Sequence, residues 1–558
     1  MTTRLRSNYE EGSSFWAVRR AQWLAMGLTE EDLLKPKIAV VNSSSRLSIC
    51  YAHLDGVAAE VSQAIRAAGG VPFEIRTVAP SDFITTAGKQ GRYLMPSRDL
   101  LVNDVEVQVE GALLDGMVLL ASCDKTTPGQ LMAAARLDIP SIVVPCGYQL
   151  GGHCTSGPVD IEELYKSVGT YKAGQISLSE LREMSCEAIK GPGVCAGLAT
   201  ANTMHILAEA LGMALSGSAP VRAGSSRMLE TARAAGRQIV RLVESGPCPR
   251  AILGRSAFEN AVKVLVSIGG SVNTVRHLIA IAAEAECKVD VIGAIEACSH
   301  LSQITMVRPN GPHRIEELDA AGGARGIMKA LSNILDLECA TVNGRTLGEL
   351  LSEAPVPDRN VIRPRSDPFR KEPGLVILRG NLAPAGAVGK ASAFPRDIRR
   401  FTGPARIFER EEDAIDALGN AGVRPGEVIV LRNLGVMGGP GTVFACSFMA
   451  ALAGAGLASQ VAVITDGELS GLNSGITIGQ VMPEAAEGGP LAAIRNGDVI
   501  RIDLDTLAVD VMLDDEEIAR RMEDWRPNAH AGVKGYLKQY AALVQPLSKG
   551  AVLGKRQF

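Results

Sequence analysis

Three absences narrow the function of this 558-residue chain. There is no excess of positive charge, because 57 Lys and Arg stand against 61 Asp and Glu, so the composition gives no electrostatic case for binding nucleic acid or an anionic membrane. No apolar run is long enough to cross a bilayer, and the N-terminus lacks an apolar core of signal-peptide length. We therefore expect a cytoplasmic protein with neither nucleic acid nor membrane as partner.

Common cofactor and redox motifs are also missing. The chain has 11 cysteines, but no two are spaced as Cys-x-x-Cys, which makes a zinc ribbon or a thioredoxin-like pair a poor interpretation. There is no Walker loop, and no Gly-x-Gly-x-x-Gly opens a first βαβ unit. In a cytoplasmic chain the cysteines would be reduced thiols or metal ligands. Any metal bound by thiols must therefore take its ligands from distant segments.

The chain is too long for one compact core, and its pattern of predicted secondary structure changes after a proline-rich stretch. Residues 355–373 contain five prolines and many charges, which is typical of a linker. Strand and helix patterns alternate before it, whereas short strands with Gly turns follow it. We predict an α/β domain over 1–360, a linker over 361–373, and a β-barrel-rich domain over 374–558.

One stretch of the first domain concentrates chemical groups. An apolar strand pattern at 117–121, a helix pattern at 130–136 and a second strand pattern at 139–145 together predict a βαβ unit. Cys123, Asp124 and Lys125 then lie at the carboxyl end of a strand, where open α/β sheets place ligand sites. The local sequence is equally compatible with a small buried Cys followed by a solvated ion pair.

Two other cysteines have a similar setting. Cys50 follows a strand pattern and opens a helix, and Cys195 lies among glycines shortly before another helix. Because loops that follow strands in this way converge at one edge of a sheet, a cluster of three thiolates is favoured over three unrelated buried cysteines. Iron–sulfur clusters are usually held by thiolates, and three ligands would leave one iron open for substrate. Asp82 follows the next strand and would reach the same edge.

Two loops of the second half could hold an anion. Residues 437–442 and 465–475 are rich in glycine, and each follows an apolar strand, so their backbone N–H groups could wrap a substrate carboxylate. Ordinary turns are the alternative for either loop. Ser470 has no nearby His and no Gly-x-Ser-x-Gly elbow, so a hydrolase triad is not indicated.

Over nearly its whole length the chain resembles the dihydroxy-acid dehydratase / 6-phosphogluconate dehydratase family, which includes sugar-acid dehydratases. The motifs are Ser122-Cys-Asp-Lys-Thr-Thr-Pro128, Ala199-Thr-Ala-Asn-Thr-Met204, Gly269-Gly-Ser-Val-Asn273, Leu378-Arg-Gly-Asn-Leu-Ala-Pro384, Gly438-Gly-Pro-Gly441, Ile464-Thr-Asp-Gly467 and Pro483-Glu-Ala-Ala-Glu-Gly-Gly-Pro490. The resemblance implies an N-terminal α/β/α sandwich domain joined to a C-terminal β-barrel-like domain, with the active site between them. It also implies a homodimer or homotetramer.

The resemblance further implies a set of cofactor ligands. Cys50, Cys123 and Cys195 match the ligands of a cluster that is [2Fe-2S] in some members and [4Fe-4S] in others. Asp82 and Asp124 match ligands of a neighbouring Mg²⁺.

Two more positions receive roles from the resemblance. Lys125 matches a lysine that is carbamylated in the family, which turns a cation into an oxygen ligand suited to Mg²⁺. Ser470 matches the serine proposed to remove the C2 proton of a 2,3-dihydroxy acid. The implied reaction is loss of the C3 hydroxyl as water and tautomerisation to the 2-oxo acid, with an open iron assisting the leaving group.

The sequence departs from the family pattern at positions expected near Mg²⁺ and near the substrate. Phe444 stands where the family carries a glutamate ligand of Mg²⁺, and Glu468 stands where it carries an arginine. Glu468 could replace the lost ligand, although a solvated loop charge is an equal alternative. These changes favour a hydro-lyase acting on a sugar-acid-like 2,3-dihydroxy acid. The alternatives are dihydroxy-acid dehydratase of branched-chain amino-acid biosynthesis, or a catalytically idle paralogue that binds a small acid or senses redox state.

Overall fold

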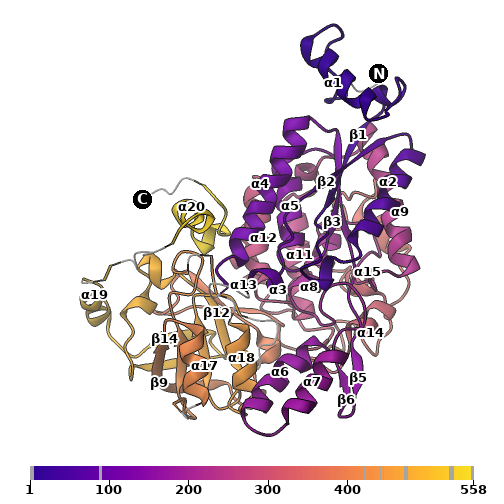
Figure 1. Cartoon of the computed structure of the whole chain (residues 1–558). Helices are drawn as coiled ribbons and strands as arrows, with labels where there is room; N and C mark the ends of the chain where they lie inside the picture. Colours follow the sequence, from indigo (N-terminus) through magenta and orange to yellow (C-terminus); the bar gives the residue numbers. More distant parts are fainter. Residues whose placement is uncertain are drawn as a thin grey trace.

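The structure is a computed structural model that describes residues 5–86, 91–419, 422–439, 441–443, 445–469, 475–523, 525–526 and 533–554. Two positions singled out above, Ser470 and Phe444, lie outside the described residues. The N-terminal half contains a four-stranded sheet, and the C-terminal half an eight-stranded one (Figure 1). The structure therefore has the predicted α/β class, with a different sheet in each half.

The N-terminal sheet is parallel and has the strand order β2-β1-β3-β4. Its strands are β1 (Lys37–Asn42), β2 (Val71–Arg76), β3 (Gly116–Ala121) and β4 (Ser141–Pro145). Every residue of β1, β3 and β4 is buried, which is typical of a parallel sheet covered on both faces. The sheet therefore forms the middle layer of an α/β/α sandwich.

Helices cover both faces of this sheet. On one face lie α2 (Leu54–Ala67) and α9 (Ser226–Ser245), which also pack against each other. On the other lie α4 (Leu94–Ala112) and α5 (Thr126–Leu137), with α12 (Thr274–Glu284) against α5 (Figure 1). The βαβ unit predicted around residue 123 is thus confirmed as β3-α5-β4, with a helix that starts four residues earlier than its apolar pattern indicated.

The remaining helices of this half extend the sandwich. They are α1 (Ser14–Ala25), α3 (Asp82–Thr85), α6 (Ile161–Lys172), α7 (Leu178–Glu187), α8 (Thr200–Ala210), α10 (Pro249–Ile252), α11 (Arg255–Ile268), α13 (Val291–Ala297), α14 (Ile315–Ala320), α15 (Gly323–Ala330) and α16 (Leu347–Ser352). A two-stranded ribbon, β5 (Gly152–Cys154) with β6 (Gly157–Val159), lies beside α7. No helix of the described residues is long and apolar enough to cross a membrane.

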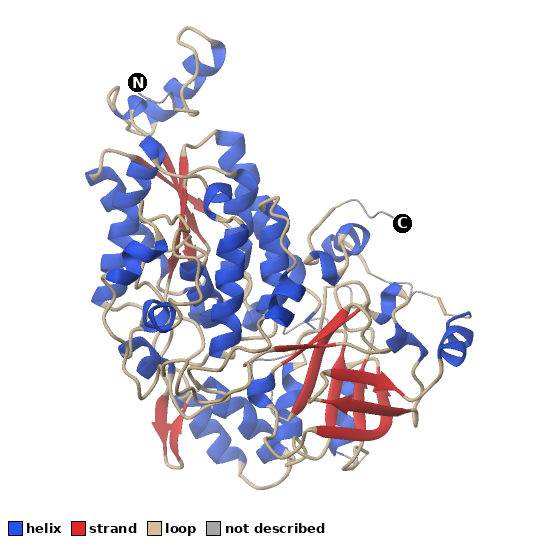
Figure 2. Ribbon diagram, turned by 180° about the vertical axis from the view of Figure 1, so that it is seen from behind, coloured by secondary structure: helices blue, strands red, loops and turns tan. Residues whose placement is uncertain are grey.

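The C-terminal sheet closes on itself into a barrel (Figure 2). Its order is β14-β13-β9-β10-β11-β12-β8-β7, and Arg379, just past β7, exchanges backbone hydrogen bonds with Leu507 and Val509 at β14. Its strands are β7 (Val376–Leu378), β8 (Gly386–Gly389), β9 (Arg400–Phe408), β10 (Val428–Leu431), β11 (Ala462–Thr465), β12 (Ile476–Met482), β13 (Val499–Asp503) and β14 (Ala508–Val511). The predicted barrel-like second half is therefore confirmed.

Strand β10 shows why the sequence of the C-terminal half contains short runs of apolar residues. Val428 and Val430 point into the barrel core, whereas Ile429 and Leu431 belong to the larger core shared with the helices and the first half. Alternate residues of a strand face opposite sides, so a strand buried on both sides must be apolar throughout. The helices of this half are α17 (Glu411–Gly419), α18 (Cys446–Gly454), α19 (Asp515–Glu523) and α20 (Tyr536–Leu543).

The two halves meet through a close contact between helices. Helix α6 of the first half packs on α18 of the second. The approach requires glycine on both sides, since a Cβ placed on Gly454 would lie 2.3 Å from the Cα of Gly169. The segment predicted as a linker is hydrogen-bonded to the first half, with Arg363 N donating to Ile304 O and Phe369 N to Gln303 O. The domain boundaries at 361–373 stay a prediction.

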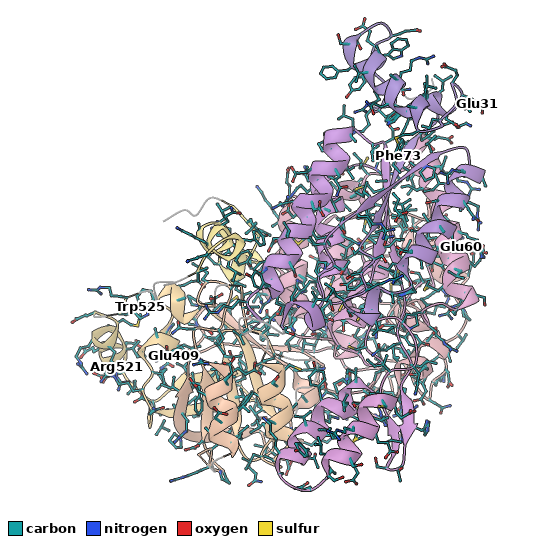
Figure 3. All side chains as sticks on the ribbon, in the orientation of Figure 1. Glu31, Glu60, Phe73, Glu409, Arg521 and Trp525 are labelled. Atoms are coloured by element: carbon teal, nitrogen blue, oxygen red, sulfur yellow. The ribbon has the colours of Figure 1, made fainter. Side chains whose placement is uncertain are left out.

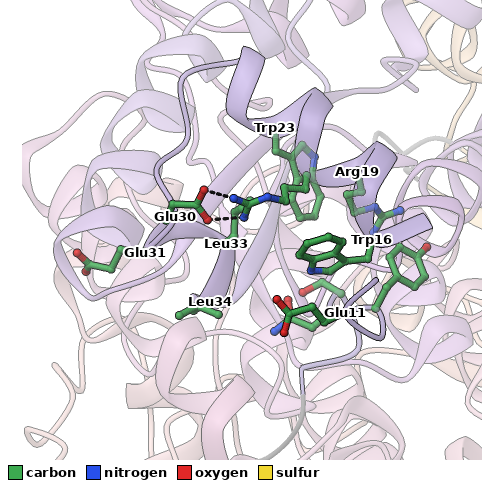
Figure 4. Close-up of a pocket in the computed structure, with 12 residues that line it drawn as sticks. Glu11, Trp16, Arg19, Trp23, Glu30, Glu31, Leu33 and Leu34 are labelled. Carbon is green, nitrogen blue, oxygen red and sulfur yellow. Dashed lines mark hydrogen bonds and ion pairs between the residues drawn. The ribbon is translucent and has the colours of Figure 1, made fainter. Parts of the chain in front are cut away.

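An N-terminal arm projects from the sandwich at the amino ends of the strands. Helix α1 has no buried residue, and the arm bounds a pocket of about 560 Å³ lined by Trp16 and Trp23 (Figure 4). An ion pair between Arg20 and Glu30 holds the arm together. Figure 3 shows Phe73 and Glu31 at this end of the molecule, with Arg521 and Trp525 far away in the second half. Because the strands separate this pocket from their carboxyl ends, it is distinct from the site described next.

Candidate active site

The loops that carry Cys50 and Cys123 lie at the carboxyl edge of the sheet and are bonded to each other. Cys50 lies in a short 3-10 turn between β1 and α2, and Cys123 in the loop between β3 and α5. Ser122 Oγ donates to Cys50 O at 2.6 Å, which joins the two loops. Tyr51 Oη, which is buried, lies 2.7 Å from Thr126 Oγ1 and donates to Pro80 O. Neighbouring parallel strands thus deliver both cysteines to one place, as predicted.

Cys195 reaches this edge by a different route. We expected it to follow a strand, but the residues before it form α7 and an irregular loop. That loop pairs with the chain beyond β4 instead, with Gln149 N donating to Val194 O at 2.8 Å and Val194 N to Gly147 O at 2.9 Å. The loop before Cys195 is therefore extended because it pairs with a distant segment of the chain. A local sequence pattern cannot reveal such a pairing. Asn202, in the first turn of α8, donates to Cys195 O at 2.8 Å.

Cys123 and Cys195 each have a pKa that is raised in part by a neighbouring thiol. The pKa of Cys123 is raised well above its usual value, first by its contact with Cys50 and then by burial. The pKa of Cys195 is also raised, first by burial and then by Cys123. Thiols that suppress each other's ionisation become stable thiolates only when cations lie among them. The arrangement therefore fits a shared iron–sulfur group.

A single metal ion fits these side chains less well. Within the described ranges, no group of three or more His, Cys, Asp and Glu side chains is placed to hold one ion. A polynuclear cluster differs because its thiolates can bind different irons, so its ligands can stand farther apart than those of one ion. The cluster assignment of Cys50, Cys123 and Cys195 stays a prediction that this geometry supports.

Asp82, Asp124 and Lys125 lie beside the thiols. The carboxyls of Asp82 and Asp124 are within hydrogen-bonding reach, and the pKa of Asp82 is raised well above its usual value, first by burial and then by the charge of Asp124. Two carboxylates this close require a proton or a cation between them, which fits Mg²⁺. Lys125 Nζ lies 3.9 Å from Asp82 Oδ1. The Mg²⁺ site and the carbamylation of Lys125 stay predictions.

Glu468 is the main surprise of the site. The interpretation as a solvated loop charge is wrong, because its side chain is fully buried. Its backbone is held by Val443 and Ala445, with Glu468 N donating to Val443 O and Ala445 N to Glu468 O. The carboxylate reaches across from the barrel half to Lys125 Nζ at 3.5 Å. Burial lowers the pKa of Lys125, but the charges of Glu468, Asp82 and Asp124 outweigh this and the net shift is upward.

Arg276 was missed in the sequence. It lies on α12, is 1% exposed, and its Nη1 is 3.4 Å from Glu468 Oε1. A signal was available, because a charged residue interrupts the apolar pattern of a predicted buried helix. Hydrogen bonds between the halves flank the pair: Asn273 Nδ2 donates to Leu469 O, and Gln480 Nε2 donates to Val272 O, both at 2.8 Å.

The backbone at and just before the predicted loop 437–442 binds two carboxylates of its own chain. Asp466 accepts from the backbone N–H of Asn433 and Leu434, at 3.1 and 2.9 Å. Glu484 accepts from three further backbone N–H groups at 3.0–3.2 Å, those of residues 436–438. These donors are therefore engaged within the protein. The other predicted loop is only partly described, since 470–474 lie outside the described residues.

Comparison with known proteins agrees with this architecture. The profile of the dihydroxy-acid/6-phosphogluconate dehydratase N-terminal domain matches residues 35–350, and that of the C-terminal domain matches 360–551. The chain belongs to this family. As a member it is a hydro-lyase, an enzyme that eliminates water from its substrate.

Individual relatives in the family match along their whole length. A protein named dihydroxy-acid dehydratase from Pyrococcus abyssi is 42% identical over 538 residues, covering 96% of this chain and 97% of its own. One of the same name from Caldanaerobacter subterraneus subsp. tengcongensis is also 42% identical with the same coverage. Another, from Syntrophobacter fumaroxidans, is 41% identical over 543 residues, with 97% and 98% covered.

Proposed function

We propose that this protein dehydrates a 2,3-dihydroxy carboxylic acid to the 2-oxo acid, and that its substrate is a small branched aliphatic acid. The observation that carries the proposal is that Cys123 contacts Cys50 and acts electrostatically on Cys195. The Asp82–Asp124 pair lies beside them, and so does Lys125, which pairs with the buried Glu468 of the barrel half. The names of the relatives support the substrate.

Each half contributes different groups to this chemistry. Cys50, Cys123 and Cys195 would hold an iron–sulfur cluster, which when bound supplies a Lewis-acidic iron for the departing C3 hydroxyl. Asp82 and Asp124 would hold Mg²⁺, which when bound supplies positive charge for the substrate oxygens. Ser470 is the proposed acceptor of the C2 proton. The C2 proton and the C3 hydroxyl leave as water, and the enol that remains tautomerises to the ketone.

The engaged loop donors favour a small substrate. A sugar acid carries a row of hydroxyl groups, and a site specific for it needs a matching row of polar partners. The backbone N–H groups of 433–434 and 436–438 are occupied by Asp466 and Glu484, so they cannot serve a polyhydroxy chain. This observation and the relatives' names move the proposal from the sugar acid favoured by sequence to the branched-chain alternative.

A sugar acid remains the second candidate because of one residue. Both carboxylate oxygens of Glu468 are buried and accept no hydrogen bond within the described part of the chain. Substrate hydroxyls beyond C3 could donate to them. The homodimer or homotetramer expected from the family is part of the same proposal, and size-exclusion chromatography with light scattering would measure it.

The test of the function uses protein reconstituted anaerobically with iron and sulfide. We expect bound iron, visible absorption, and conversion of 2,3-dihydroxyisovalerate to its 2-oxo acid in the presence of Mg²⁺. Cys123→Ala should lose the absorption, whereas Cys186→Ala, at an exposed cysteine, should keep it. Turnover of aldonic acids alone would select the sugar-acid candidate. A full cluster without turnover of any tested acid would support an idle paralogue, and a colourless protein would overturn the proposal.

A further inference from the structure

Arg276 is a buried cation whose hydrogen-bonding groups are unused. Its side chain is 1% exposed, yet none of Nε, Nη1 and Nη2 has a hydrogen-bond partner in the described residues. The ion pair with Glu468 at 3.4 Å does not have the geometry of a hydrogen bond. A guanidinium carries five N–H donors in a planar fork, and leaving them unpaired away from water is costly. A ligand that accepts hydrogen bonds from this fork would offset that cost.

The position of Arg276 defines which ligand that is. Glu468 lies between Arg276 Nη1 and Lys125 Nζ, at 3.4 and 3.5 Å, so the guanidinium adjoins the candidate catalytic groups. The charges of Asp82 and Asp124 also act on Lys125. The planar fork matches a carboxylate through two parallel hydrogen bonds, which a lysine cannot reproduce.

A purely structural role would be to neutralise Glu468. Lys125 already provides a positive partner for that carboxylate at a similar distance. A pair formed for stability would also be expected to share hydrogen bonds, as buried ion pairs that contribute to folding do. Neither Glu468 oxygen accepts one within the described residues.

We propose that Arg276 binds the carboxylate of the acid substrate through its guanidinium fork, and that Glu468 is the internal anion that competes with the substrate for it. Arg276 then determines specificity for acids over neutral analogues. This rests on the proposed function only in taking the substrate to be a carboxylic acid.

The test compares an acid with its amide. The first probe is 2-hydroxy-3-methylbutanoate, which lacks the C3 hydroxyl and cannot be dehydrated, and the second is the corresponding amide, which lacks the charge. Calorimetric titration of the reconstituted protein gives the ratio of their dissociation constants. We expect the wild type to bind the acid at least about tenfold more tightly than the amide, the range of a charge-assisted bidentate contact.

Two substitutions should move this ratio in opposite directions. Arg276→Met should lower it towards one, leaving only the preference that the proposed Mg²⁺ supplies, whereas Glu468→Gln should raise it about three- to tenfold because the competing anion is gone. Arg276→Lys, which keeps the charge without the fork, should give an intermediate ratio and serves if the methionine variant does not fold. Arg255→Met, at an exposed arginine paired with Glu259, is the control and should keep the wild-type ratio.

These outcomes separate the inference from the proposed function. If the protein discriminates acid from amide through Arg276 but turns over no dihydroxy acid, carboxylate binding by Arg276 is supported and the proposed dehydratase function is contradicted. If the wild type binds both probes equally, or if Arg276→Met and Arg276→Lys both keep the wild-type ratio, the inference is overturned even when turnover is present. A fall in the ratio with Glu468→Gln would also overturn it, because Glu468 would then support acid binding.

Discussion

Two arginines, Arg98 on α4 and Arg276 on α12, are both buried, but their surroundings differ. Arg98 donates through Nη2 to Asp99 Oδ1 at 2.9 Å and to the carbonyls of Gly550 and Ala551 at 3.2 and 2.9 Å. Arg276 donates to none of the described residues. Both are almost inaccessible to solvent. The first ties the C-terminal segment to the sandwich, whereas the second keeps its donors open, so equal burial does not imply an equal role.

The largest expected effect tests this difference directly. Arg98→Met should lower the free energy of unfolding by about 3–5 kcal/mol, because it leaves Asp99 without its partner in a buried position. Arg276→Met should change the free energy of unfolding by less than about 1 kcal/mol, because Glu468 retains its ion pair with Lys125. Urea unfolding followed by circular dichroism measures both. Adding Asp99→Asn to Arg98→Met should recover part of the loss, and equal losses for the two arginine variants would remove the distinction.

The same contrast holds for two buried glutamates, with a smaller effect. Glu484→Ala would leave three buried backbone N–H groups without acceptors, and we expect a loss of about 3 kcal/mol. Glu468→Ala breaks two buried ion pairs but leaves no hydrogen-bond donor of the described residues newly unpaired, and Lys125 keeps Asp82, so it should cost less, about 1–2 kcal/mol. The measurement is again urea unfolding. A larger loss at Glu468 than at Glu484 would mean that the Arg276 region is held together for stability.

A third prediction concerns the close contact between α6 of the first half and α18 of the second. Gly454→Ala places a Cβ against Gly169 and should cost about 2 kcal/mol, because α18 must move away from α6. Gly419→Ala is a matched control in α17, where a Cβ meets nothing within 4 Å, and it should stabilise by about 0.5–1 kcal/mol. Thermal unfolding compares the two. A stabilised Gly454→Ala would show that the helix contact is looser than its geometry indicates.

The smallest expected effect concerns a buried carboxylate that is fully bonded. Burial raises the pKa of Glu209 to about 7, although Gly217, Ser218 and Ala219 donate backbone hydrogen bonds to it. The folded protein then holds a proton that the unfolded chain has lost, so stability falls as pH rises from the unfolded value towards 7. Between pH 6 and 8 this contribution should fall by about 1 kcal/mol. Unfolding of Glu209→Gln should lack this component, and an unchanged pH slope would contradict the assignment.

Much of the site could be predicted because it follows from regular local patterns. The apolar runs and helix period around Cys123 predicted β3-α5-β4, and parallel strands bring the following loops to one edge, so Cys50 and Asp82 could be placed beside Cys123. The reason for placing Cys195 there was partly wrong, because its loop does not follow a strand and pairs with the chain after β4 only once the domain has folded.

The sequence by itself determined the α/β class with a barrel-like second half and the family, because strand and helix periodicity and short motifs are local properties. Only the tertiary structure decided the roles of Arg276 and Glu468. They are 192 positions apart in the sequence, and nothing in either neighbourhood indicates the other. The docking of barrel on sandwich brings a loop carboxylate and a helix guanidinium together, and that same docking removes water from both, so a contact between domains turned two ordinary charges into a candidate recognition site.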